Sequence, residues 1–334
     1  MMPPRTALPR PAGLIVCRDG GPAPPALRGA AVAVGNFDGV HLGHRALIGA
    51  AAEVARAEGR PAAVLTFEPH PRAYFRPGEP LFRLTPEPVK LAILGRLGLD
   101  GAFVRAFDAR LAATSAEAFV AGILKEELGA GAVVVGHDFR FGRGREGDAP
   151  ALRRLAEAQG LGCRIVPAVT RGGEPVSSSA VRAALERGDA GAAAALLGHR
   201  WWVAGEVVHG EKRGRTMGFP TANLDLGPGC RLAHGIYAVR VGLDDGTVRD
   251  GVASYGRRPT FDNGAALLET HLLDFRGDLY GRAIEVEFAA WIRGEERFES
   301  AEALTLRMRR DAEEARAALA QPLPEGVESL IGRG

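Results

Sequence analysis

The sequence is poor in cysteine, and its three cysteines are scattered. Cys17, Cys163 and Cys230 are odd in number, lie far apart in the 334 residues and form no CxxC pair. This spacing argues against a disulfide scaffold and against a structural zinc site. A reducing cytoplasm is the compartment that such a cysteine content indicates.

Long apolar runs and a strong net charge are also missing. No uninterrupted apolar stretch is long enough to span a bilayer. Residues 1–12 contain four prolines and lack the continuous apolar core of a signal peptide. Lys plus Arg number 42 and Asp plus Glu 40, a net charge of +2. This balance argues against a broad nucleic-acid surface and leaves small phosphorylated ligands open. We therefore expect a cytoplasmic protein with neither a membrane nor a nucleic-acid partner.

The first half of the chain alternates between apolar strand-like runs and helix-like segments. This alternation predicts βαβ units with a parallel sheet, whose ligands bind at the carboxyl ends of the strands. The expected strands are Ala30–Val34, Ala62–Phe67, Gly101–Arg105, Ala132–Val135 and Arg164–Val166. The expected helices are Leu42–Ala57, Glu87–Leu97, Ser115–Leu128, Ala149–Gln159, Ser178–Glu186 and Ala190–Leu197.

The pattern changes near Gly198. Short alternating runs follow, separated by Gly, Asp and Asn, which is typical of a small antiparallel barrel or sandwich. These runs are Trp202–Val208, Gly235–Val241, Leu267–Leu273 and Ile284–Phe288. Ser300–Leu319 is a closing helix for which Ser300 is a suitable N-cap. The length suits two domains, which we place at residues 1–190 and 191–334.

The stretch GNFDGVHLGH (35–44) is the most informative part of the first half. Gly35 follows a strand, where a glycine lets the backbone turn and approach a ligand. His41 and His44 face the same side if a helix starts near Val40. At a helix N-terminus they can bind a phosphate and stabilise charge that develops at phosphorus. Two alternatives stay open: capping or surface histidines, and a metal site that includes His70.

The stretch GEKRGRTMGFPTANLDL (210–226) is its counterpart in the second half. Thr221 and Asn223 are two apart, so in an extended segment both side chains point the same way. A hydroxyl and an amide oxygen placed in this manner can hold Mg²⁺ and nucleotide phosphates. No GxxxxGK[ST] loop occurs in the chain. A polar turn that leads into a strand is the alternative interpretation.

The first half resembles the N-terminal domain of bacterial bifunctional riboflavin kinase/FAD synthetases. GNFDGVHLGH is similar to their HxGH nucleotidyltransferase motif, and three further stretches fit in order: FEPHPRAYFRP (67–77), VGHDFRFGRGREGD (135–148) and VSSSAVRAAL (176–185). The resemblance implies a Rossmann-like FMN adenylyltransferase domain whose nucleotide contacts come from Gly35, Phe37, Asp38, Asp138 and Phe139. It also implies that Ser178 and Arg182 bind the ATP phosphates. The family usually has an arginine where Ala180 stands.

The second half resembles the riboflavin kinase domain of the same family. The similarity runs through GRTMGFPTAN (214–223), HGIYAV (234–239), GVASYGRRPTF (251–261), LLETHLLDFRGDLYG (267–281) and WIRGEERFES (291–300). Glu269 interrupts an apolar run, so its carboxylate can face a cleft and accept the proton of a substrate hydroxyl. A plain polar residue on a half-exposed strand is the alternative, and the resemblance assigns the base to Glu269. It also implies nucleotide or flavin contacts at Gly218 and Arg282.

Together the two halves predict a flavin cofactor synthase. The second domain would phosphorylate riboflavin with MgATP to give FMN, and the first would adenylylate FMN with ATP, giving FAD and pyrophosphate. Ser254 and Tyr255 replace the Asn-Ile that the family usually has, and we expect a local change there without lost activity. Two rivals stay open: a chain with only one of the activities, and a flavin- or nucleotide-binding protein without turnover. Self-association is possible in each case.

Overall fold

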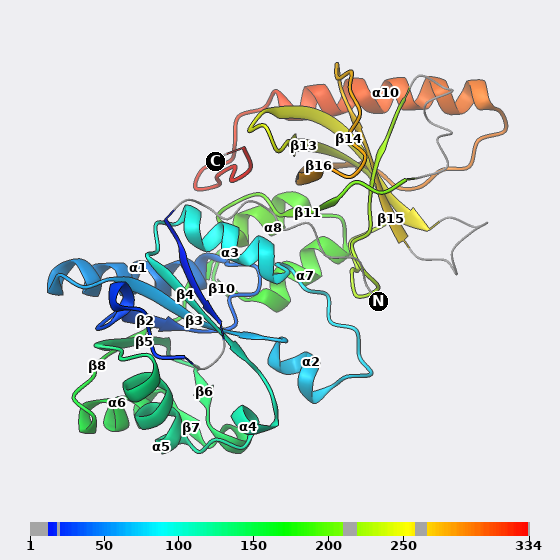
Figure 1. Cartoon of the computed structure of the whole chain (residues 1–334). Helices are drawn as coiled ribbons and strands as arrows, with labels where there is room; N and C mark the ends of the chain where they lie inside the picture. Colours follow the sequence, from blue (N-terminus) through cyan, green and yellow to red (C-terminus); the bar gives the residue numbers. More distant parts are fainter. Residues whose placement is uncertain (1–12, 19–20, 210–218, 258–265, 333–334) are drawn as a thin grey trace. The chain divides into compact units, whose positions relative to one another are not determined.

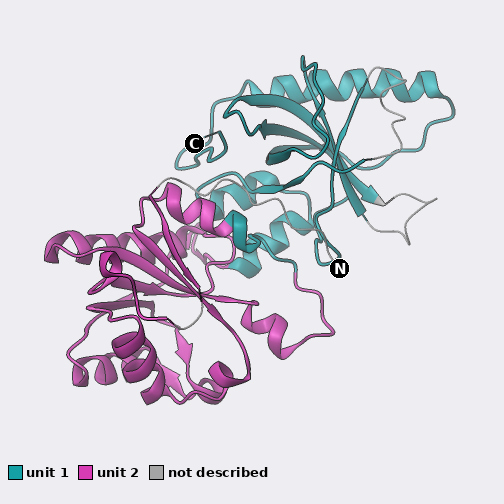
Figure 2. Ribbon diagram, in the orientation of Figure 1, with its two compact units in different colours: residues 1–9, 82–89, 178–334 teal, residues 10–81, 90–177 magenta. Residues whose placement is uncertain are grey.

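The computed structural model describes residues 13–18, 21–209, 219–257 and 266–332. The chain divides into two compact units, coloured in Figure 2. Among the described residues, unit 2 contains 13–81 and 90–177, and unit 1 contains 82–89 and 178–332. Unit 1 therefore takes up a short segment from the first half of the sequence. The boundary after residue 190 stays a prediction, since helices α7 (Ser178–Glu186) and α8 (Ala190–Leu197) cluster with unit 1.

Unit 2 is built on a six-stranded parallel sheet in the order β1-β4-β3-β2-β5-β8 (Figure 1). The strands are β1 (Ile15–Arg18), β2 (Ala31–Val34), β3 (Ala62–Glu68), β4 (Gly101–Ala106), β5 (Ala132–Gly136) and β8 (Gly162–Val166). From the central β2, the chain moves to β3 and β4 on one side and later to β5 and β8 on the other. The strand order thus reverses between β2 and β5, and in such sheets ligands bind outside the carboxyl ends of the strands at that reversal.

Helices flank the sheet of unit 2. They are η1 (Pro25–Leu27), α1 (Leu42–Glu58), α2 (Pro71–Phe75), α3 (Glu87–Arg96, shared with unit 1), α4 (Ala109–Ala112), α5 (Ala116–Ala118), the π-helical η2 (Phe119–Glu127), η3 (Arg143–Arg145) and α6 (Ala149–Ala158). Two short pairs complete the unit: β6 (Arg140–Phe141) with β7 (Gly147–Asp148), and β9 (Thr170–Arg171) with β10 (Glu174–Pro175). Val32, Leu65 and Val133 pack with η2 and α6 in one buried core.

Unit 1 is an antiparallel six-stranded sheet in the order β11-β16-β13-β14-β15-β12. The strands are β11 (Trp202–Glu206), β12 (Ala222–Leu224), β13 (Gly235–Gly242), β14 (Val248–Arg257), β15 (Ala266–Leu272) and β16 (Ala283–Arg293). An antiparallel bridge between Val208 and Asn223 joins the chain after β11 to β12, which nearly closes the sheet into a barrel. Tyr237, Val286 and Phe288 fill the interior.

Helix α10 (Ala301–Leu319) covers the outside of the barrel of unit 1 (Figure 1). Ala315 and Leu319 pack on Ala238 of β13. Ser300 caps the helix, as predicted, because its Oγ accepts from the Ala303 N–H at 3.1 Å. Both fold predictions, a Rossmann-like parallel sheet and a small antiparallel barrel with a closing helix, are confirmed.

Candidate functional site

The loop between β2 and α1 starts at the carboxyl end of the central strand, next to the reversal in strand order. Phe37 and Val40 have φ angles of 50° and 45°, in the left-handed region that non-glycine residues rarely occupy. Phe37 is fully buried and Asp38 is 2% exposed. A strained, buried loop of this kind persists because surrounding contacts hold it, and such loops cluster at ligand sites.

His41 and His44 stand together at the start of helix α1. His41 is the N-cap, and its Nδ1 accepts from the His44 N–H at 3.3 Å. This nitrogen therefore carries no proton, and a neutral His41 has its proton on Nε2. The two rings stack with centroids 3.7 Å apart, and the centroid of the Phe37 ring lies 5.2 Å from that of the His44 ring. The expectation that the histidines share one side of a helix start agrees with this geometry.

The His44 imidazole is held in its neutral form. Burial, followed by the charges of His41 and Lys90, keeps the pKa of His44 well below its ordinary value of 6.5. The residue retains some exposed surface, but its Nδ1 is buried and has no hydrogen-bond partner among the described residues. A buried polar atom without a partner is costly. A ligand that bonds to this nitrogen would relieve that cost.

The metal alternative finds no support in the described residues. His70 caps helix α2, where its Nδ1 accepts from the Arg72 N–H at 3.1 Å. The described part of the chain holds no group of three or more His, Cys, Asp or Glu side chains suited to a metal.

Lys90 is a charged residue of this region that the sequence analysis missed. It is 1% exposed, and its Nζ lies 2.8 Å from Glu68 Oε1 and 2.9 Å from Thr66 Oγ1. The signal was a lone lysine inside the apolar run VKLAIL (89–94). Lysine is almost never fully buried unless it is paired.

The remaining predicted residues of the first site are spread over both units. Asp138 is exposed, and Phe139 stacks on Phe141 with centroids 5.5 Å apart. Ser178 begins α7, and Arg182 on the same helix is buried and donates through Nε to the Phe82 carbonyl at 2.7 Å. These two residues belong to unit 1, whereas the histidines belong to unit 2.

In unit 1, strand pairing aligns the predicted kinase residues. Asn223 on β12 stands directly opposite Glu269 on β15, and Glu269 is opposite Ser254 on β14. Directly opposed residues of antiparallel strands project from the same face. This row of three side chains therefore brings together two predicted residues, Asn223 and Glu269. It also places Ser254, one of the two departures from the family pattern, beside the proposed base, whereas Tyr255 points into the core.

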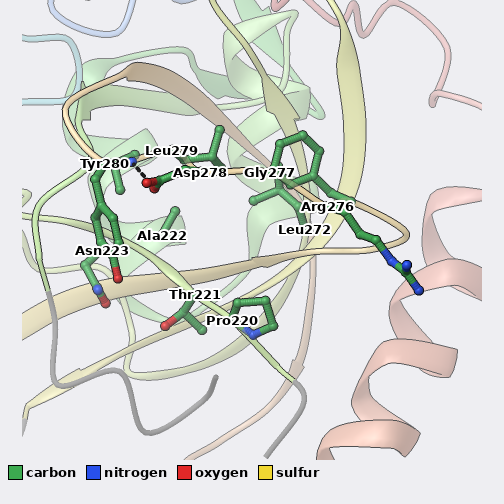
Figure 3. A pocket seen from close by; sticks show the side chains of 12 residues that line it. Pro220, Thr221, Ala222, Asn223, Leu272, Arg276, Gly277, Asp278, Leu279 and Tyr280 are labelled. Carbon is green, nitrogen blue, oxygen red and sulfur yellow. Dashed lines mark hydrogen bonds between the residues drawn. The ribbon is translucent and has the colours of Figure 1, made fainter. Parts of the chain in front are cut away.

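Thr221 and Asn223 line a cavity of about 300 Å³ (Figure 3). Asp278, Leu279 and Tyr280 form the facing wall, while the Arg276 side chain points away from the cavity. Asn223 is 2% exposed, and its Oδ1 has no hydrogen-bond partner among the described residues. An orphaned amide oxygen beside a threonine hydroxyl fits a hard, oxygen-seeking cation such as Mg²⁺.

Three further residues were predicted for the kinase site: Glu269, Arg282 and Gly218. Glu269 does not line this cavity, although it neighbours Asn223 across the sheet. Arg282 is paired with the Asp244 carboxylate, and this contact raises the pKa of Arg282. Gly218 lies outside the described residues.

His271 was also missed by the sequence analysis. It lies two residues after Glu269 on β15, and its Nδ1 is 2.9 Å from the Pro220 carbonyl. A carbonyl only accepts, so this nitrogen donates. The hydrogen bond fixes the backbone next to Thr221.

Two family models match the chain over the two halves that the motifs marked. The FAD synthetase model matches residues 23–180, and the riboflavin kinase model matches residues 197–319. A bifunctional riboflavin kinase/FMN adenylyltransferase from Escherichia coli (strain K12) is 42% identical over 289 residues, which are 86% of this chain and 92% of that protein. The chain belongs to the bifunctional riboflavin kinase/FMN adenylyltransferase family.

Other similar proteins agree in sequence or in fold. A bifunctional riboflavin kinase/FMN adenylyltransferase from Bacillus subtilis (strain 168) is 36% identical, over 85% of this chain and 90% of that protein. A crystal structure described as a macrolide-efflux protein from Streptococcus pneumoniae superposes with a TM-score of 0.80 at 30% identity, over 90% of this chain and 99% of that one. The two activities of the chain convert riboflavin to FMN and FMN to FAD, with ATP as co-substrate.

Within the described ranges, no helix combines the length and apolar character needed to cross a bilayer.

Proposed function

We propose that His41 and His44 form the phosphate-binding part of the adenylyltransferase site. The FMN phosphate attacks the α-phosphorus of ATP, an oxygen–phosphorus bond forms, and pyrophosphate leaves. Charge builds up on the phosphate oxygens during this displacement, and preorganised donors at a helix N-terminus stabilise it. The observation that carries this proposal is the stacked imidazole pair at the start of α1, with a buried and unpartnered Nδ1 on His44.

Other residues would complete this site. Gly35, Phe37 and Asp38 would line the nucleotide pocket, since they form the strained loop that leads to His41. Asp138 and Phe139 would contact the nucleotide from the loop after β5. Ser178 and Arg182 would bind the ATP phosphates.

In the kinase unit, we assign Thr221 and Asn223 to Mg²⁺ and the ATP phosphates, and Glu269 to the general base. Mg²⁺ held by these two side chains would supply positive charge that offsets the negative charge of the phosphates. Glu269 takes the proton of the riboflavin hydroxyl as the oxygen attacks the γ-phosphorus and ADP leaves. The orphaned Asn223 Oδ1 and the register that sets Asn223 opposite Glu269 support these roles. Arg282 would contact the flavin after leaving Asp244, and Gly218 would complete the nucleotide loop.

Two single substitutions test these roles in the full chain. With riboflavin and MgATP, His44→Ala should let FMN accumulate without FAD. Glu269→Ala should lower FMN formation by ~10²–10⁴-fold, because general-base help is of that size, yet should still convert added FMN to FAD. Exposed Glu299→Ala is the matched control and should leave both reactions unchanged. Normal FAD formation by His44→Ala, or normal FMN formation by Glu269→Ala, would refute the assignment.

We also infer a cytoplasmic location from the three scattered cysteines, which form no CxxC pair. Self-association stays a prediction, which sedimentation of the full chain tests.

A further inference from the structure

Lys90 holds a buried positive charge directly behind the loop that carries His41. Its Nζ donates to Glu68 Oε1 at 2.8 Å, to Thr66 Oγ1 at 2.9 Å and to the Asn36 carbonyl at 3.3 Å. Glu68 and Thr66 lie at the carboxyl end of β3, next to β2. Burying an ammonium group is unfavourable unless it is paired and hydrogen-bonded. Lys90 meets this condition, and one of its partners is Asn36 in the loop between β2 and α1.

The Asn36 carbonyl is the point at which Lys90 holds the loop. This oxygen also accepts from Thr66 Oγ1 at 3.2 Å, so two side chains fix it. Phe37 and Val40, which follow in the same loop, have positive φ angles that their surroundings must enforce. Movement of Asn36 would shift the loop and with it the N-cap His41.

The second effect of Lys90 is electrostatic. Among the described residues, the His41 ring and the Phe37 ring contact His44, and the charge of Lys90 on α3 acts on it. Burial lowers the pKa of His44 most, and the charges of His41 and Lys90 lower it further. Glu68 pairs with Lys90 and partly offsets its charge at His44.

We propose that Lys90 is a positioning residue of the adenylyltransferase site, which anchors the loop that carries His41 through the Asn36 carbonyl and holds a buried positive charge behind it. This inference rests on the proposed function of His41 and His44. A neutral imidazole has one N–H that can donate to a phosphate oxygen, and it carries no charge that burial would penalise. An imidazolium would present two donors and would need a counter-ion in a buried place.

The test combines activity with a titration of His44 in the full chain. Lys90→Met should lower FAD formation from FMN and MgATP roughly 10–100-fold, because small misplacements of catalytic groups cost that much. Formation of FMN from riboflavin by the same protein should be unchanged. Exposed Lys125→Met is the matched control, and we expect it to leave both reactions unchanged.

The titration separates this role from a purely structural one. Histidine labelled with ¹³C gives a pH-dependent signal for His44, identified by its absence from His44→Asn. Lys90→Met should move the His44 midpoint to higher pH, and Lys90→Arg should restore it toward the original value. Glu68→Gln should move it to lower pH, because the charge of Lys90 is then less compensated. These last two variants keep the test decisive if Lys90→Met does not fold.

Two results would overturn the inference in distinguishable ways. In the first, the His44 midpoint is unchanged in Lys90→Met, and FAD formation falls only as far as the thermal stability of the protein falls. If His44→Ala still blocks FAD formation, Lys90 is then a structural residue and the proposed function stands. Normal FAD formation by His44→Ala would refute the proposed function itself, and the role of Lys90 with it.

Discussion

His44 couples the chemistry of the adenylyltransferase unit to its stability. The folded protein holds the pKa of this imidazole well below 6.5, whereas the unfolded chain takes up a proton near that value. The unfolded state therefore binds more protons as the pH falls below about 6.5, and folding becomes less favourable. The contribution of His44 to the free energy of unfolding is complete at pH values above its pKa in the unfolded chain. It is lost as the pH falls toward its pKa in the folded protein.

Lowering the pH from 7.5 to 5.5 should reduce the free energy of unfolding of unit 2. Protonation of His44 in the unfolded state should account for up to about 1.4 kcal/mol of this reduction. His44→Gln should remove that share of the pH dependence, because a glutamine does not titrate. Urea unfolding at a series of pH values measures this difference. Exposed His137→Gln is the control. An identical pH dependence in His44→Gln and the unchanged chain would contradict a neutral, buried imidazole.

At the scale of single residues, local spacing revealed the histidine pair but not its support. HxxH after a strand predicts two imidazoles on one side of a helix start, because that depends only on neighbouring residues. The partners of Lys90 are 54, 24 and 22 positions away in sequence. Only the strand order brings them together.

The start of helix α1 is the element on which the first site depends. A Cβ added at Gly43 would lie 3.1 Å from Cε1 and 3.2 Å from Nδ1 of the His41 ring. That is tighter than ordinary van der Waals contact, so the ring must shift. Gly49 lies in the same helix, and a Cβ there meets nothing within 4 Å.

Gly43→Ala and Gly49→Ala form a matched pair. Both replace glycine by a better helix former, which is worth roughly 0.5–1 kcal/mol of stability. Gly43→Ala should lower FAD formation roughly 10-fold by displacing His41, and should spare FMN formation. Gly49→Ala should change neither reaction. Steady-state assays of both half-reactions measure this, and equal FAD formation in the two variants would show that the His41 position is not critical.

Elements were predictable where the pattern was long and regular. The predicted helix over Ser178–Glu186 coincides with α7, and Leu42–Ala57 ends one residue before the end of α1. Edge strand β1 was not predicted, because it has four residues and is only partly buried. Continuous helix over Ser115–Leu128 was expected, and the structure instead joins a short α5 to the π-helical η2.

At the scale of the whole molecule, two units with separate cores account for two reactions. The core of unit 1 includes Phe82 and Leu84, although these residues precede most of unit 2 in sequence. Trp201 donates to the Leu84 carbonyl at 2.9 Å, and its ring meets Phe82 edge-on at 5.9 Å. A composition change near Gly198 indicated two domains. It could not reveal that residues 82–89, which lie far upstream of Gly198, belong to unit 1.

The central claim is that one chain transfers a γ-phosphoryl group at one site and an adenylyl group at another. The most direct test incubates the full chain with riboflavin, Mg²⁺ and ATP labelled with ³²P at either the γ- or the α-phosphorus. With γ-label, both FMN and FAD should become radioactive, because the FMN phosphate is retained in FAD. With α-label, FAD should be the only radioactive flavin. Label from the α-position in FMN, or FMN without label from the γ-position, would contradict the account.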